Sequence, residues 1–226
     1  NSMAIFAANV EISRAFGQKE LSLEWRNKYT LGGLILYVTS TIFVAYLSFK
    51  KLDSIPAWNA LFWIIQLFAA TNAIGKSFVQ DGEEQHLYLY TLVPPQAIIL
   101  SKIIYNAILV SFLTIVGFFL YTLFINDPIQ DHGMFFTAML LGSLGFSSTL
   151  TLVAGIASQS GNNLVLMSIL GFPIILPLLM TLIAFSKNAI DGIAWSINLK
   201  YVVVLGGLNV IVVALSYLLF PYLWRD

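Results

Sequence analysis

Six stretches of the chain are long, apolar and almost free of charge. They span residues 30–49, 55–74, 97–125, 133–157, 163–186 and 201–223. A helix that crosses a bilayer needs about 20 consecutive, mostly apolar residues. Lys102 is the only charged residue within the six stretches. The pattern therefore predicts an all-α integral membrane protein with six transmembrane helices.

The composition agrees with a membrane protein and limits its chemistry. Of the 226 residues, 58% are hydrophobic and 10% are charged, whereas soluble domains carry about 25% charged residues. The net charge is zero, which gives no field for nucleic acid, and cysteine is absent. With only two histidines, His86 and His132, we predict no metal site and no directly bound cofactor. No internal repeat is present, so residues 1–226 are interpreted as a single transmembrane domain.

Residues 4–28 precede the first stretch and have a different pattern. Apolar residues recur there at helical spacing, with polar residues on the other side: Ile5, Ala8, Ile12, Ala15 and Phe16 against Glu11, Arg14 and Gln18. This pattern is typical of an amphipathic helix that lies in the membrane interface. A soluble helix docked on a partner is the alternative.

The distribution of lysine and arginine predicts the orientation. With the N-terminus inside, the inner side holds Arg14, Lys19, Arg26, Lys28, Lys76, Lys102 and Arg225, and the outer side holds Lys50, Lys51, Lys187 and Lys200. The excess inside favours cytoplasmic N- and C-termini. Residues 77–95 then lie in the cytoplasm.

The polar groups within the six stretches are neutral, apart from Lys102. They include Gln66, Asn72, Asn106 and Asn209. Ion-coupled carriers and proton pumps normally keep ionisable side chains in the membrane, so a self-powered transporter is disfavoured. A sodium site built from backbone carbonyls stays open. We expect Lys102, near the entry of its stretch, to extend its amino group towards the membrane surface.

Two further patterns concern helix packing. The fourth stretch carries a stripe of small residues at steps of four: Ser143, Ser147, Thr151 and Gly155. Such stripes allow helices to approach closely, either within the bundle or at a subunit interface. In the fifth stretch, Pro173 and Pro177 predict a bend, used either for packing alone or as a hinge on the substrate path.

Two motifs resemble catalytic or nucleotide-binding signatures without their context. Residues 70–77 (ATNAIGKS) are similar to a phosphate loop, but no strand precedes them and no acid-ended strand follows. Lys76 is better interpreted as an anchor at the inner membrane face. Residues 145–148 (GFSS) lack a nearby histidine, since His132 lies at the outer end of the same helix. His132 itself is interpreted as an exposed loop residue, with iron ligation as the alternative, and we expect a non-catalytic subunit.

The most charged segment lies between the second and third stretches. Residues 80–95 read QDGEEQHLYLYTLVPP. If residues 83–92 form a helix, its acids occupy the first turn, where the helix dipole favours negative charge, and the double proline ends it. A short helix in the cytoplasmic plane with exposed Tyr88 and Tyr90 is suited to docking a protein.

Residues 80–95, followed by residues 98–102 (IILSK), resemble the segment between spans two and three of the CcmB family, heme exporter protein B of cytochrome c maturation. Residues 158–163 (SQSGNN) running into residues 170–177 (LGFPIILP) are similar to the family's loop and paired-proline helix. Length, the six spans and the amphipathic start also agree. One departure is Thr91, where the family often has proline.

The resemblance implies an ABC-2-like permease that is driven by a separate ATPase. The coupling residues would be Gln80, Asp81, Gly82, Glu83, Glu84, His86, Leu87, Tyr88 and Leu92. Expected partners are an ATP-binding CcmA-like subunit, a heme-handling CcmC-like subunit and a small CcmD-like subunit in the bacterial inner membrane. Heme would be the cargo of the complex. The alternatives are an ABC-2 permease for a lipid, drug or polysaccharide, a membrane enzyme, or a self-powered channel or carrier.

Overall fold

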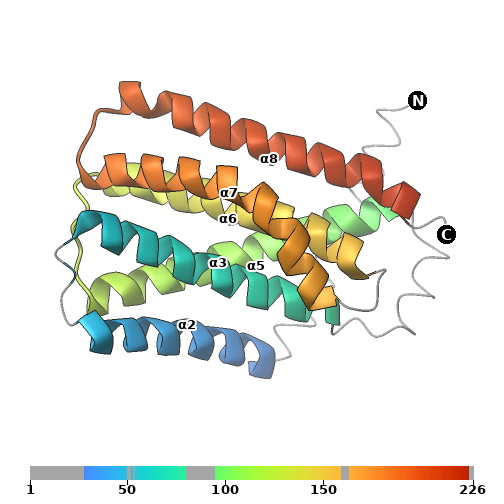
Figure 1. Ribbon diagram of the computed structural model, residues 1–226, viewed down its shortest axis with the longest axis horizontal. Coiled ribbons are helices and arrows are strands. Elements are labelled where there is room, and N and C mark those ends of the chain that lie inside the picture. The colour runs from blue at the N-terminus through green and yellow to red at the C-terminus, as the bar shows by residue number, and fades with distance from the viewer. Residues whose placement is uncertain (1–27, 50–51, 53, 80–94, 159–162, 224–226) are drawn as a thin grey trace.

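The computed structural model describes residues 28–49, 52, 54–79, 95–158 and 163–223, and their secondary structure is helical. The helices are α2 (Lys28–Phe49), α3 (Ile55–Val79), α5 (Pro95–Phe124), α6 (His132–Ala157), α7 (Asn163–Ile190) and α8 (Trp195–Leu223). They run alternately up and down in one bundle (Figure 1). Each contains a stretch that is long and apolar enough to cross a membrane. The predicted all-α membrane fold with six spans is confirmed.

Three helices run four or more residues further than the apolar pattern predicted. α3 continues to Val79, α7 continues to Ile190 and α8 begins at Trp195. The apolar pattern ends near lysines, but backbone hydrogen bonding continues past them, because a helix needs no apolar side chains at its ends. α6 begins where Asp131 caps it, since its Oδ1 accepts the backbone N–H of Met134 at 2.9 Å.

α6 is the central helix of the bundle. It packs against α3, α5, α7 and α8, whereas α2 packs on α3 and α5 at the periphery. Glycines on α6 make the approach close. A Cβ atom at Gly142 would lie 2.7 Å from the indole of Trp63 on α3, and one at Gly145 would lie 2.7 Å from Leu178 on α7. Lacking side chains, these glycines let two neighbouring helices pack directly onto the α6 backbone.

The two ends of the bundle differ. The end of α2, the start of α3 and the connections of residues 125–131 and 191–194 lie together at one end, here called the short-loop end (Figure 1). An aromatic core fills the bundle near it, in which the rings of Trp58 and Tyr121 lie 4.9 Å apart and both contact Phe62. The opposite end is where α3 finishes and α5 begins, and the connection of residues 80–94 leaves from there.

Candidate functional site

The predicted coupling residues lie in residues 80–94, outside the described part of the chain, as do all but the last residue of the predicted amphipathic helix at 4–28. The helix ends that flank the coupling segment are described. Phe78 is near the end of α3, and Lys102 lies in the second turn of α5. The amino group of Lys102 is 4.7 Å from the centroid of the Phe78 ring. These two residues therefore join the two helices between which the coupling segment runs.

Lys102 is buried against the end of α3, and its extension towards the membrane surface stays a prediction. Its side chain is 5% exposed, and Phe78, against which it lies, is 8% exposed. The aromatic face of Phe78 attracts the amino group. Lys76, by contrast, is exposed in the last turn of α3.

The stripe of small residues on α6 lies inside the bundle, and its members are buried. The hydroxyls of Ser143 and Ser111 are 2.8 Å apart. Asn106 Nδ2 donates to Thr151 Oγ1 at 2.8 Å, and a Cβ at Gly155 would lie 3.0 Å from the Phe220 ring. Three members of the stripe therefore contact α5 or α8 of the same chain. The fourth member, Ser147, is also buried.

A groove of about 580 Å³ lies between α5, α6 and α8. Its lining includes Leu100 and Ile103 from α5, Ser147 and Ser148 from α6, and Val213 from α8. The two serine hydroxyls donate to the carbonyl of Leu144 on their own helix. The groove therefore presents mainly hydrocarbon, which suits an apolar molecule or part of one.

A second set of polar side chains joins α3 to α7. Ser186 Oγ accepts from Trp63 Nε1 at 2.8 Å and lies 2.8 Å from Asn59 Oδ1, to which it donates. Asn59 Nδ2 donates to the carbonyl of Ile183 at 2.9 Å. The sequence did not lead us to predict these hydrogen bonds between α3 and α7. The presence of Asn59 and Ser186 in apolar stretches could have indicated them, because neutral polar residues within spans usually hydrogen-bond across helices.

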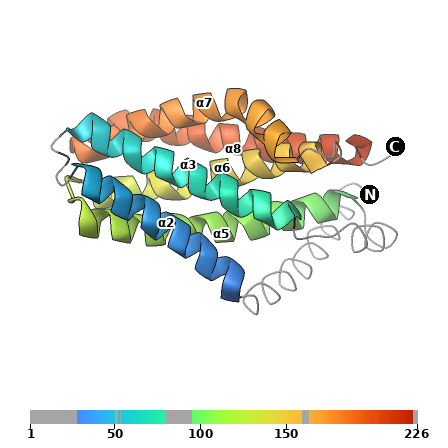
Figure 2. The same ribbon diagram turned by 60° about the horizontal axis from the view of Figure 1, so that its bottom comes forward.

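α7 is bent near its middle, as Figures 1 and 2 show. Pro173 and Pro177 lie in this part of the helix, and both are exposed. Proline lacks the backbone N–H, so the carbonyls of Ile169 and Pro173 lose their helical donors. The bend is thus part of the fold, and its use as a hinge stays a prediction.

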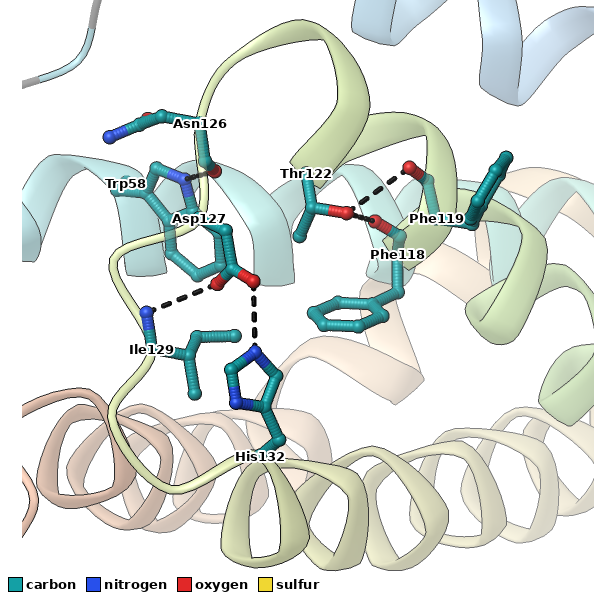
Figure 3. A network of polar contacts seen from close by, with 8 residues as sticks. All are labelled: Trp58, Phe118, Phe119, Thr122, Asn126, Asp127, Ile129 and His132. Carbon is teal, nitrogen blue, oxygen red and sulfur yellow. Dashed lines mark hydrogen bonds and ion pairs between the residues drawn. The ribbon is translucent and has the colours of Figure 1, made fainter.

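Polar contacts hold the 125–131 connection at the short-loop end (Figure 3). Asp127 Oδ2 lies 2.9 Å from His132 Nε2, and its Oδ1 accepts the backbone N–H of Ile129 at 3.1 Å. The carbonyl of Asn126 accepts from Trp58 Nε1 at 3.0 Å. His132 is exposed and separated from Ser147 by about 22 Å of helix. A serine–histidine pair is therefore not formed.

The motif at residues 70–77 lies wholly within α3. A phosphate loop needs a loop between a strand and a helix, so that backbone N–H groups can face the phosphates. In a continuous helix these N–H groups bond to carbonyls one turn back, and Ala70, Ala73 and Ile74 are buried. This segment has no phosphate-binding geometry. Within the described ranges there is also no cluster of three His, Cys, Asp or Glu residues that could hold a metal.

Comparison with known proteins returned one family. The family model described as CcmB protein matches residues 12–222. The match includes almost all of the six described helices and the connections between them. A search of curated proteins found no match.

Proposed function

Since the chain belongs to the CcmB family, we propose that it is the permease subunit of a heme exporter that serves cytochrome c maturation. The observation that carries the proposal is the family match over residues 12–222, on a chain with six helices able to span a membrane. The complex would lie in the bacterial inner membrane, with both termini of this chain in the cytoplasm. Heme would be the cargo of the complex.

The energy for transport comes from a separate ATPase in this proposal. The six apolar stretches of the sequence contain one charged residue, Lys102, while Lys76, Lys187 and Lys200 lie near helix ends. Carriers coupled to ions or protons generally need more charged groups within the membrane. The ATPase docks on residues 80–92, whose sequence offers the negative charges of Asp81, Glu83 and Glu84 followed by Tyr88. The short-loop end then faces the outer side and holds His132.

The proposed partners are an ATP-binding CcmA-like subunit, a CcmC-like subunit that handles heme and a small CcmD-like subunit. The chain itself contributes no catalysis and holds no metal or cofactor in this assignment. The residues proposed to dock the ATPase are Gln80, Asp81, Gly82, Glu83, Glu84, His86, Leu87, Tyr88 and Leu92. The small residues of α6 and the two prolines of α7 have a structural role in this proposal, in helix packing and in the bend.

Affinity purification of the chain from membranes in mild detergent tests the proposal. We expect an ATPase subunit and further membrane subunits to co-purify with the wild-type chain. The double variant Glu83→Lys/Glu84→Lys should retain its fold and membrane insertion but lose the ATPase. Lys187→Glu/Lys200→Glu, a double reversal at the short-loop end, is the matched control and should retain the ATPase. Normal ATPase recovery with the glutamate variant would contradict docking on this segment.

A second candidate is an ABC-2 permease for another cargo, such as a lipid, drug or polysaccharide. The groove between α5, α6 and α8 supports the lipid version, because its lining is mainly hydrocarbon. The two candidates differ in one outcome. Only the first predicts that deletion of the chain abolishes covalent heme attachment to c-type cytochromes.

A further inference from the structure

Lys102 is an unusual residue for a position inside the bundle. In the described ranges it is the only charged residue among those that are buried. It lies about 10 Å along α5 from Pro95, within the membrane-spanning segment. Ile99 and Ile103, in the same part of α5, form an apolar cluster with Phe220, so this part of the helix is otherwise mainly apolar. A charged residue at such a position usually has a function.

The contact of Lys102 with Phe78 is placed where the coupling segment begins and ends. Phe78 is the second-last residue of α3, which finishes at Val79, and α5 begins at Pro95. The distance of 4.7 Å between the amino group and the ring centroid is within the range of a cation–π interaction. The contact therefore ties together the two helix ends from which residues 80–94 leave.

One turn further along α5, Asn106 makes the next link. Its Nδ2 donates to Thr151 Oγ1 on α6 at 2.8 Å, and both residues are fully buried. Residues four apart lie on the same face of a helix. One face of α5 thus carries both the contact to the end of α3 and the hydrogen bond to the central helix.

We infer that Lys102 is a positioning residue that couples ATP hydrolysis by the docked ATPase to the membrane helices, by holding the end of α3 to the start of α5. This inference rests on the proposed function, in which an ATPase docks on that connection. The Lys102–Phe78 contact makes the ends of α3 and α5 move together, and the bond between Asn106 and Thr151 carries the movement to α6. Without the positive charge, the ends of α3 and α5 are no longer held to each other, and ATP hydrolysis is uncoupled from α6.

The test uses Lys102→Met, which fills similar space without the charge, and Lys102→Arg, which keeps the charge. Lys76→Met is the matched control, because Lys76 is exposed in the last turn of α3. Each variant is expressed with all its partner subunits in cells that lack their own copy. Three quantities are measured: recovery of the ATPase subunit with the purified complex, its rate of ATP hydrolysis, and covalent heme attachment to c-type cytochromes.

Lys102→Met should retain the ATPase subunit and its hydrolysis rate, while heme attachment falls roughly tenfold. Lys102→Arg should restore most of the attachment, and Lys76→Met should match the wild type. Wild-type heme attachment in Lys102→Met would overturn the inference. If Lys102→Met fails to assemble, Phe78→Leu is used instead and should separate hydrolysis from attachment in the same way. Failure of both variants to assemble would show that the contact serves folding alone and would also overturn it.

The wild-type complex distinguishes this inference from the proposed function. If the wild type recovers no ATPase, or if its deletion leaves heme attachment unchanged, the proposed function is wrong. If both wild-type results hold and Lys102→Met behaves as wild type, only the role of Lys102 is wrong.

Discussion

Gly142 on α6 lies directly against Trp63 on α3, so that a Cβ at position 142 would be 2.7 Å from the indole ring. Trp63 is held in place, because its Nε1 donates to Ser186 on α7 at 2.8 Å. The ring therefore cannot move aside without loss of a buried hydrogen bond. This contact links α3, α6 and α7 through one aromatic side chain.

Gly142→Ala is expected to destabilise the protein. The added methyl group overpacks the contact with Trp63, which typically costs about 1–3 kcal/mol. The free energy of unfolding in detergent measures the effect. Gly207→Ala on α8 is the matched control, because no atom lies within 4 Å of a Cβ at that position. Equal stability of the two variants would contradict the close packing described for α6.

Ser186→Ala should also destabilise the bundle. The change leaves Trp63 Nε1 without its acceptor and Asn59 Oδ1 without its donor in a buried place, and an unsatisfied buried polar group costs about 1–3 kcal/mol. Ser48→Ala serves as control, since Ser48 is exposed and donates only to Val44 of its own helix. Thermal unfolding in detergent should separate the two variants clearly. A Ser186→Ala variant as stable as Ser48→Ala would show that the polar set does not hold α3 to α7.

Asp131→Ala should loosen the start of α6. The carboxylate accepts the backbone N–H of Met134 at 2.9 Å, and loss of such a cap costs about 1 kcal/mol. Asp131→Asn retains an acceptor oxygen and should stay near wild-type stability. Hydrogen exchange of the first turn of α6 reports the change locally. The cap would be unimportant if both variants exchanged at the wild-type rate.

The double variant Pro173→Ala/Pro177→Ala tests whether the bend in α7 is a hinge. Alanine restores two backbone donors and is favoured over proline within a helix by up to about 3 kcal/mol per residue. We expect an unfolding free energy at or above that of the wild type, together with reduced heme attachment to c-type cytochromes. Full heme attachment in a stable double variant would show that the bend serves packing alone.

The sequence predicted the six helices because a membrane span depends on a local property, a run of apolar residues. Their ends were less accurate, as at Val79 and Trp195, because helical hydrogen bonding continues into polar residues. Contacts between helices were not predictable from one sequence. Neither the meeting of Asn59 with Ser186 nor the burial of Lys102 follows from local pattern, since each depends on which helices become neighbours.

The central claim is that this chain is the permease subunit of a heme exporter in cytochrome c maturation. Its most direct test is heme staining of c-type cytochromes in cells that lack the chain, with and without the wild-type chain supplied from a plasmid. The account predicts that the deletion abolishes covalently attached heme while the apocytochrome is still made, and that the plasmid restores it. Unchanged heme attachment in the deletion strain would contradict the account.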